Sequence, residues 1–145
     1  MMDDENPDNL DAIYPVGEKR PDSVRTRNGR PLRDLTLDNL LAGHVATSDF
    51  GITAEGLRLQ AAIAERAGRP NLAQNLRRGA ELVEIPDDVL LDVYERLRPG
   101  RAQNADDLRA AANQLRDTYG AKETASLLEE AALVYERRGI FQRRF

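Results

Sequence analysis

The sequence predicts an all-α protein, a compact bundle of five or six helices with an extended N-terminal arm. Three observations lead to this prediction. Apolar residues recur at helical spacing between residues 34 and 140. Thr, Asn, Pro and Gly stand where these segments would begin or end. No segment alternates apolar and polar residues as a half-buried strand does, and no hairpin signal is present.

The first 33 residues differ from the rest in charge and proline content. Residues 1–11 hold five carboxylates and no base, whereas residues 18–33 hold six bases against two carboxylates. Four of the seven prolines lie in the same stretch, where they disfavour regular structure. We therefore expect 1–33 to be an extended or partly disordered arm, with 1–11 disordered and 18–33 docked in an acidic groove of a partner. Residues 34–145 are expected to form the helical domain.

Three helices are predicted in the first half of that domain. Thr36 and Thr53 can accept hydrogen bonds as N-caps, and Pro70 suits the first turn of a helix. Gly43 and Gly68 stand where the first two helices would end. The predicted helices cover residues 37–42, 54–67 and 71–85. The apolar residues expected to line the second and third are Leu57, Leu59, Ala61, Ile63, Ala64, Leu72, Leu76, Ala80 and Val83.

Three more helices are predicted in the second half. Pro86 opens the first of them and Pro99-Gly100 ends it, while Asn104 can cap the next. Gly120 and Gly139 end the last two. The predicted helices cover residues 86–98, 105–119 and 121–138. Their expected core residues are Leu90, Val93, Tyr94, Leu97, Leu108, Ala111, Ala112, Leu115, Tyr119, Ala125, Leu128, Ala131, Ala132 and Tyr135.

The composition excludes much catalytic chemistry. The chain has no Cys and a single His, so thiolate nucleophiles, disulfides, Cys-type zinc sites and His clusters cannot be built from it. His44 is expected to be a solvated or capping imidazole in a loop. The adjacent acidic pairs would point about 100° apart on a helix, so they would not converge on one atom. Neither phosphate-loop nor dinucleotide motif is present. We expect no catalytic, cofactor-binding or metal-binding residue in this chain.

Charge and hydropathy argue against nucleic acid and membrane as partners. The formal net charge is −4, whereas nucleic-acid-binding domains are usually basic. Residues 71–85 and 86–98 could suggest a helix-turn-helix, but the second segment carries four carboxylates that would repel phosphate. No apolar run approaches the roughly 20 residues that span a bilayer. The acidic start lacks the features of a secretory signal, so we expect a cytoplasmic protein.

Arginine provides the candidate contacts with a protein partner. The bases are nearly all Arg, whose planar side chain makes bidentate pairs and is favoured at interfaces. Any one of them can also belong to a solvated face. We expect a partner subunit to be contacted by the arm and by the turn around Pro99-Gly100, through Arg25, Arg27, Arg30, Arg33, Arg98 and Arg101.

Several stretches resemble one protein family over about residues 29–139. They include LTLDNLLAG at 35–43, ITAEGLRLQ at 52–60, AAIAERAGRP at 61–70 and EAALVYERRG at 130–139. The longest is LAQNLRRGAELVEIPDDVLLDVYERLRPGR at 72–101. Together they resemble the small (gamma) subunit of adenosylcobalamin-dependent diol dehydratase and glycerol dehydratase.

The resemblance implies a non-catalytic, mostly helical subunit that stabilises a larger enzyme. In that family, a large TIM-barrel subunit and a medium subunit complete a dimer of heterotrimers, and here they can be separate or fused. The holoenzyme converts 1,2-propanediol or glycerol to an aldehyde and water by a radical mechanism in the large subunit. Adenosylcobalamin lies between the large and medium subunits, so this chain alone should bind no cofactor.

Two further functions stay open at this point. One is a free-standing helical adaptor that has diverged from such a complex. The other is a small enzyme whose fold brings two carboxylates together in a pocket. Some family members carry an amphipathic N-terminal helix that targets a bacterial microcompartment. The acidic, Pro-containing residues 1–11 lack such an apolar stripe, so encapsulation through them is not expected.

Overall fold

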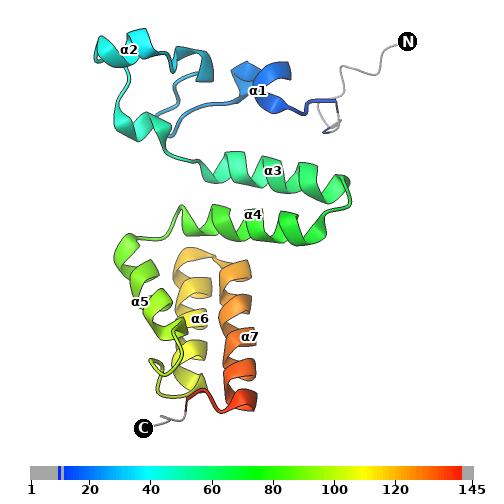
Figure 1. Ribbon diagram of the computed structural model, residues 1–145, viewed down its shortest axis with the longest axis vertical. Helices are drawn as coiled ribbons and strands as arrows, with labels where there is room; N and C mark the ends of the chain where they lie inside the picture. Colours follow the sequence, from blue (N-terminus) through cyan, green and yellow to red (C-terminus); the bar gives the residue numbers. More distant parts are fainter. Residues whose placement is uncertain (1–9, 11, 142–145) are drawn as a thin grey trace. The chain divides into compact units, whose positions relative to one another are not determined.

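The computed structural model describes residue 10 and residues 12–141. These residues form seven α-helices and three short 3₁₀ turns, with one isolated β-bridge, so the predicted all-α class is confirmed. We expected residues 1–11 to be disordered. All of these except residue 10 lie outside the described residues. The α-helices are α1 (Val16–Lys19), α2 (Leu37–Leu41), α3 (Ala54–Arg66), α4 (Pro70–Leu82), α5 (Asp87–Leu97), α6 (Ala105–Tyr119) and α7 (Lys122–Arg138), shown in Figure 1.

The chain divides into two compact units, which we describe separately. The first ends at Ala80 and the second begins at Glu81. Neither limit coincides with the boundary expected at residue 33, and the division into an arm and a helical domain stays a prediction.

In the first unit, α3 and α4 form an antiparallel pair (Figure 1). Thr53 caps α3 as predicted, its hydroxyl accepting a hydrogen bond from the backbone N of Gly56 at 3.1 Å. The two helices meet through the buried alanines Ala61, Ala64 and Ala73, with Leu76 against them. Leu72, predicted to face the core, is 44% exposed. That prediction was wrong because the small residue beside it, Ala73, points at α3 instead.

The N-terminal segment of this unit contains more local structure than the sequence predicted. Besides α1, it forms 3₁₀ turns η1 (Pro21–Ser23) and η2 (Leu32–Asp34). A β-bridge joins Arg25 to Pro31, closing a tight loop. Short hydrogen-bonded turns of this kind are compatible with the prolines, because a 3₁₀ turn can begin at Pro21 without needing its missing amide proton.

In the second unit, α6 and α7 pack antiparallel along their length and α5 lies against them (Figure 1). Leu108, Leu115 and Leu128 are its largest fully buried side chains. Val93 of α5 packs in the same cluster as Leu115 and Leu128. Tyr94 was expected in this core but is 65% exposed. The helical period places Val93 on the inner face of α5 and leaves Tyr94, about 100° away, on the outer one.

The start of α7 is capped by a residue from a distant part of the sequence. Asn104 caps α6 as predicted, accepting from the backbone N of Asp107 at 3.0 Å. The N-cap position of α7 is Ala121, which has no capping side chain. The carboxylate of Glu81 takes its place by accepting hydrogen bonds from the backbone N of Glu123 at 2.8 Å and of Thr124 at 2.8 Å. It also accepts one from the Thr124 hydroxyl at 2.7 Å.

Candidate partner-binding surface

The six arginines predicted as partner contacts lie in two groups, one in each unit. Four belong to the N-terminal segment of the first unit, and two flank the turn that follows α5 in the second. Arg25, Arg27 and Arg33 are exposed, whereas Arg30 is half-buried. Arg98 and Arg101 are both exposed. Exposed guanidinium groups of this kind are suited to bind carboxylates of another protein.

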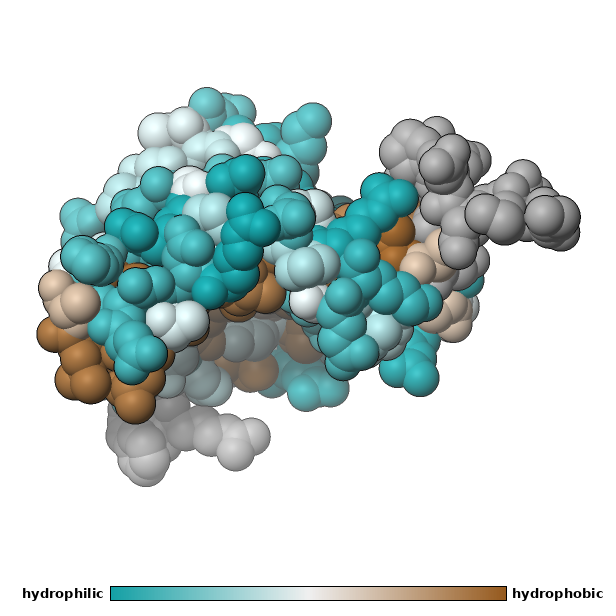
Figure 2. Space-filling model, turned by 90° about the horizontal axis from the view of Figure 1, so that it is seen from above, coloured by the Kyte–Doolittle hydropathy of each residue, from teal (hydrophilic) through white to brown (hydrophobic). Residues whose placement is uncertain are grey.

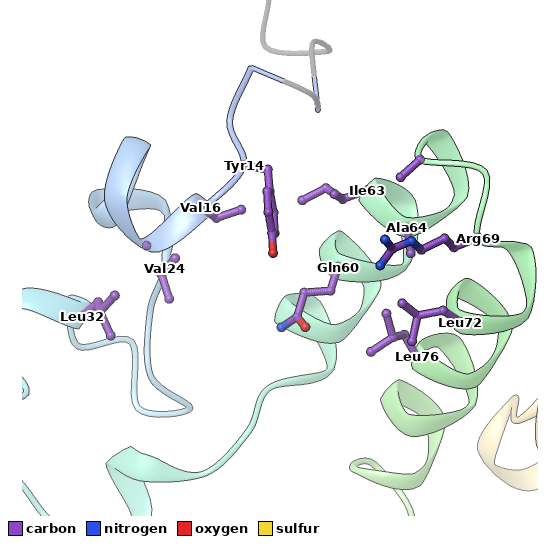
Figure 3. Close-up of a pocket in the computed structure, with 12 residues that line it drawn as sticks. Tyr14, Val16, Val24, Leu32, Gln60, Ile63, Ala64, Arg69, Leu72 and Leu76 are labelled. Atoms are coloured by element: carbon purple, nitrogen blue, oxygen red, sulfur yellow. The ribbon is translucent and has the colours of Figure 1, made fainter.

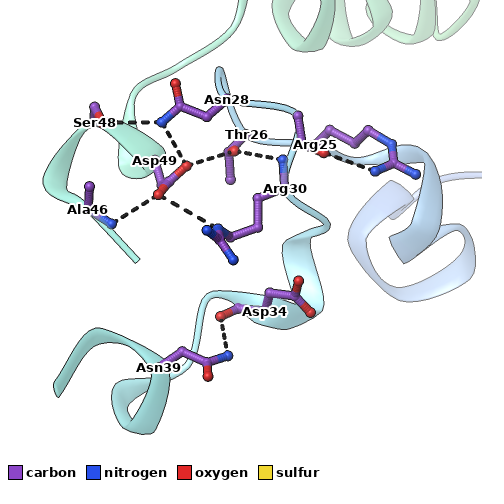
Figure 4. Close-up of polar contacts among 10 residues, drawn as sticks. Arg25, Thr26, Asn28, Arg30, Asp34, Asn39, Ala46, Ser48 and Asp49 are labelled. Atoms are coloured by element: carbon purple, nitrogen blue, oxygen red, sulfur yellow. Dashed lines mark hydrogen bonds and ion pairs between the residues drawn. The ribbon is translucent and has the colours of Figure 1, made fainter. Parts of the chain in front are cut away.

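A buried carboxylate organises the loop that carries the first group (Figure 4). Asp49 is only 4% exposed, and it lies in the 3₁₀ turn η3 (Thr47–Phe50). One of its oxygens accepts hydrogen bonds from the Thr26 hydroxyl at 3.0 Å and the Asn28 side-chain amide at 2.9 Å. The other accepts from the backbone N of Ala46 at 2.9 Å. These bonds join the Arg25–Pro31 loop to η3.

The same contacts favour the ionised form of Asp49. The Ala46 N–H bond is the main cause that lowers the pKa of the Asp49 carboxyl below its ordinary value of 3.8. The hydrogen bonds from Asn28 and Thr26 and the charge of Arg30, whose Nε lies 3.8 Å away, act in the same direction. Burial acts in the opposite direction but does not prevail. Sequence analysis missed Asp49, because neighbouring residues do not reveal a partner more than twenty positions away.

The arginines of the loop are consequently of two kinds. Arg30 faces Asp49 and helps to hold the loop together. Arg25 donates to the carbonyl of Gly29 at 2.9 Å, and Arg33 pairs with Asp22 at 2.9 Å, both at the surface. An exposed ion pair stabilises a fold very little, so Arg33 can change partners at small cost. The role of Arg30 as a partner contact stays a prediction.

In the second unit, Arg98 and Arg101 share one carboxylate. Each lies 3.0 Å from Glu95, so the group keeps one uncompensated positive charge. Tyr135 holds the end of α5 in position by donating its hydroxyl proton to the carbonyl of Leu97 at 2.6 Å. The ring of Tyr135 in turn packs edge-on against Phe141, with centroids 5.8 Å apart. The two arginines therefore stand on an anchored turn.

Large apolar residues are exposed in and after α2. None of the residues of α2 is buried. Figure 2 shows that hydrophobic residues reach the molecular surface. The exposed apolar residues of this segment are Leu37, Leu40, Leu41, Phe50 and Ile52, each at least 41% exposed. Such a concentration of exposed large apolar residues is typical of a surface that another molecule covers.

An apolar cavity of about 640 Å³ lies between the N-terminal segment and the α3–α4 pair of the first unit (Figure 3). Val24, Leu32, Ile63 and Leu76 contribute to its walls, and its polar groups include Gln60 and Arg69. Its size is that of a small-ligand pocket. The described side chains that line it are mostly apolar and include no Asp, Glu, His, Ser or Cys, while Tyr14 contributes a hydroxyl.

The described part of the chain brings no metal-ligand set together. No group of three or more His, Asp or Glu residues within it could hold a metal ion. His44 is exposed in the loop after α2. Among the helices described, none combines the length and apolar character needed to cross a membrane.

Comparisons with known proteins point to one family. A family model described as dehydratase small subunit matches residues 10–142. The propanediol dehydratase small subunit of Citrobacter freundii is 46% identical over 125 residues, which cover 86% of this chain and 72% of that protein. The propanediol dehydratase small subunit of Salmonella typhimurium strain LT2 is 45% identical over the same lengths.

Proposed function

The chain belongs to the dehydratase small subunit family, and on this basis we propose that it is the non-catalytic small subunit of a coenzyme B12-dependent diol dehydratase. The substrate of the complex is 1,2-propanediol or glycerol, and the product is an aldehyde formed with loss of water. The observation that carries the proposal is the 46% identity to a propanediol dehydratase small subunit over 86% of the chain.

In this proposal the radical chemistry takes place on the other subunits. The adenosylcobalamin is held between the large and medium subunits, and the substrate reacts in the barrel of the large one. Radical intermediates need a closed cavity from which water and side reactions are excluded. The small subunit contributes by stabilising the assembly that encloses this cavity. The exposed apolar and basic surfaces of the chain support such a role, because they suit contact with protein.

The proposed partners are a large and a medium dehydratase subunit, separate or fused, arranged as a dimer of heterotrimers. The arm around residues 15–35 and the turn at 98–101 contact the large subunit through Arg25, Arg27, Arg33, Arg98 and Arg101, with Arg30 supporting the loop. The exposure of the first five side chains supports this assignment. A cytoplasmic location remains part of the proposal, and cell fractionation tests it.

Reconstitution tests the function directly. Large and medium subunits from the same organism are loaded with adenosylcobalamin, with and without the chain, and aldehyde formation and thermal inactivation are followed. We expect the complete complex to be more active or to survive longer. Full activity and full stability without the chain would refute the proposal and favour a free-standing adaptor. Aldehyde formation by the chain alone would refute its non-catalytic role.

The arginine contacts have a matched control. Arg98→Glu/Arg101→Glu should weaken co-purification with the large subunit, because it reverses the charge of the anchored turn. Arg137→Glu changes an exposed arginine in the last turn of α7 and should not. Equal co-purification of both variants would remove Arg98 and Arg101 from the interface.

A further inference from the structure

We propose that Asn28 is a site of spontaneous deamidation, that its contact with Asp49 protects it while the Arg25–Pro31 loop is closed, and that the carboxylate formed there keeps the loop open. Among the asparagines of the chain, only Asn28 is followed by glycine. Asparagine is one of the thermolabile residues of proteins, and before glycine no side chain hinders the attacking backbone nitrogen. This inference goes beyond the proposed function and does not depend on it.

The reaction uses the backbone N of Gly29 as its nucleophile. This nitrogen attacks Cγ of Asn28, so that a bond forms between the two atoms while the bond from Cγ to Nδ2 breaks. The proton of the Gly29 N–H leaves with the amine as ammonia, and a cyclic imide remains. Water then opens the imide at either carbonyl and gives aspartate or its β-linked isomer at position 28. Because nucleophile and target are neighbours in one chain, no reactant besides water is needed.

Both reacting groups are engaged while the loop is closed. The N–H of Gly29 donates to the carbonyl of Thr26 at 2.9 Å. The side-chain amide of Asn28 donates to Asp49 at 2.9 Å and to the Ser48 hydroxyl at 3.2 Å (Figure 4). The attack on Cγ requires the bonds to Thr26 and Asp49 to break. Deamidation therefore has to wait for a local opening of the loop.

The turn explains why this reactive pair stands in the loop. Gly29 has a φ of 78°, a backbone conformation that favours glycine. Asn-Gly is accordingly a frequent turn sequence. Asn28 and Gly29 are both exposed, so water reaches the imide as soon as it forms. The susceptibility of Asn28 is thus a consequence of the residues that the turn requires.

The product cannot restore the contact with Asp49. An aspartate at position 28 places an acceptor where Asn28 now donates, so two carboxylates would face each other at hydrogen-bond distance. Asp49 is only 4% exposed, and like charges repel more strongly where water does not screen them. The β-linked isomer also lengthens the main chain by a methylene group inside the turn. Either product therefore releases the Arg25–Pro31 loop from η3.

The first experiment measures the rate of deamidation in the full chain. The chain is incubated at neutral pH and cleaved after glutamate, and mass spectrometry follows the peptide of residues 19–55, which contains both Asn28 and Asn39. A synthetic peptide of residues 24–32 gives the rate without the loop contacts. We expect Asn28 to deamidate at least about tenfold more slowly in the chain than in the synthetic peptide. Asn39 precedes leucine and should stay unchanged.

Two variants test whether the Asp49 contact gives the protection. Asp49→Ala removes the acceptor of the Asn28 amide and should raise the rate toward that of the synthetic peptide. Asp22→Ala removes an exposed carboxylate of the same segment and should leave the rate unchanged. Circular dichroism shows whether Asp49→Ala is folded, and Thr26→Val, which removes one donor to Asp49, replaces it if it is not.

Three results of this experiment would overturn the inference. One is an equal rate for Asn28 in the wild-type chain and in the synthetic peptide, because the loop would then give no protection. Another is an unchanged rate in the folded variant that lacks the Asp49 contact. The third is deamidation of Asn39 as fast as that of Asn28, because the following glycine would then confer no susceptibility.

The second experiment tests the effect of the product. Asn28→Asp introduces the carboxylate, and Asn28→Ala removes the same hydrogen bonds without adding a charge. Opening of the loop is followed by hydrogen exchange of the backbone amides of Gly29 and Arg30, both of which donate to Thr26 in the closed loop. We expect faster exchange in Asn28→Asp than in Asn28→Ala. Equal or slower exchange in Asn28→Asp would contradict the proposal that the carboxylate keeps the loop open.

Discussion

Glu81 and Thr124, 43 positions apart in the sequence, are joined by two hydrogen bonds, one to the Thr124 backbone N and one to its hydroxyl. A single carboxylate thereby satisfies amide groups in the first turn of α7 that have no partner within the helix. Its negative charge also lies at the positive end of the helix dipole. The first turn of α7 is thus held by the side chain of Glu81.

Replacement of this cap should destabilise the second unit. Glu81→Gln exchanges an acceptor for an amide NH₂ that faces N–H donors, and we expect a loss of about 1–2 kcal/mol in the free energy of unfolding. Urea denaturation followed by circular dichroism measures it. Glu130→Gln alters an exposed carboxylate of α7 itself and should change stability by less than about 0.5 kcal/mol. Equal effects would mean that Glu81 is dispensable as a cap.

Asp49 should make the loop of Arg25 and Arg30 sensitive to acid. Its pKa is lower in the folded state than the ordinary 3.8, mainly because of the Ala46 N–H bond. The contribution of Asp49 to folding stability is therefore fully present above its unfolded-state pKa. It is lost as the pH falls through its folded-state pKa. We expect Asp49→Asn to be less stable than wild type at pH 7, with the difference shrinking as the pH falls below 3.8. A stability difference that stays constant across this pH range would contradict the lowered pKa of Asp49.

The two threonine caps should differ in their effect on stability. Thr53 begins a helix of 13 residues with four buried side chains, whereas Thr36 begins one of five residues with none. Thr53→Ala should cost about 1 kcal/mol of global stability, and Thr36→Ala distinctly less, since little packing depends on α2. Denaturant midpoints of the two variants provide the comparison. A larger effect at Thr36 would show that α2 supports the core.

The core of the second unit can be tested with two leucines of one helix. Leu128 is fully buried among α5, α6 and α7, whereas Leu133 is 56% exposed. Leu128→Ala should cost about 2–5 kcal/mol because it removes packing and leaves a cavity. Leu133→Ala should cost less than about 1 kcal/mol. Denaturant unfolding of both variants checks this, and similar losses would mean that α7 is rotated about its axis.

Helix ends were predictable from the sequence where their signals are local. Thr36, Thr53 and Asn104 each bond an amide three positions ahead, as their place before an apolar run predicted. Gly120 and Gly139 end α6 and α7 with φ of 65° and 64°, a backbone conformation that favours glycine. The Glu81 cap could not be predicted in this way, because Glu81 and Thr124 are 43 positions apart in the sequence.

The partner contacts predicted for the six arginines stay a prediction. Arginine composition pointed to the loop and to the turn after α5, and five of those six side chains are exposed. The leucines of α2 escaped notice because an apolar pattern shows which residues avoid water, not whether their own chain or another covers them. Tyr94 illustrates the same limit, since it was assigned to the core and lies outside it. The cavity in the first unit could not be predicted either, because the segments that line it are distant in the sequence.

The brevity of α2 has a kinetic consequence. A helix of five residues without buried side chains has almost no intrinsic stability, so its backbone bonds break and re-form easily in the isolated chain. Its amide protons should therefore be replaced by solvent deuterium within seconds when the subunit is free. Enclosure by a second protein would slow that replacement by orders of magnitude, so mass spectrometry of this one peptide would test whether a partner covers α2.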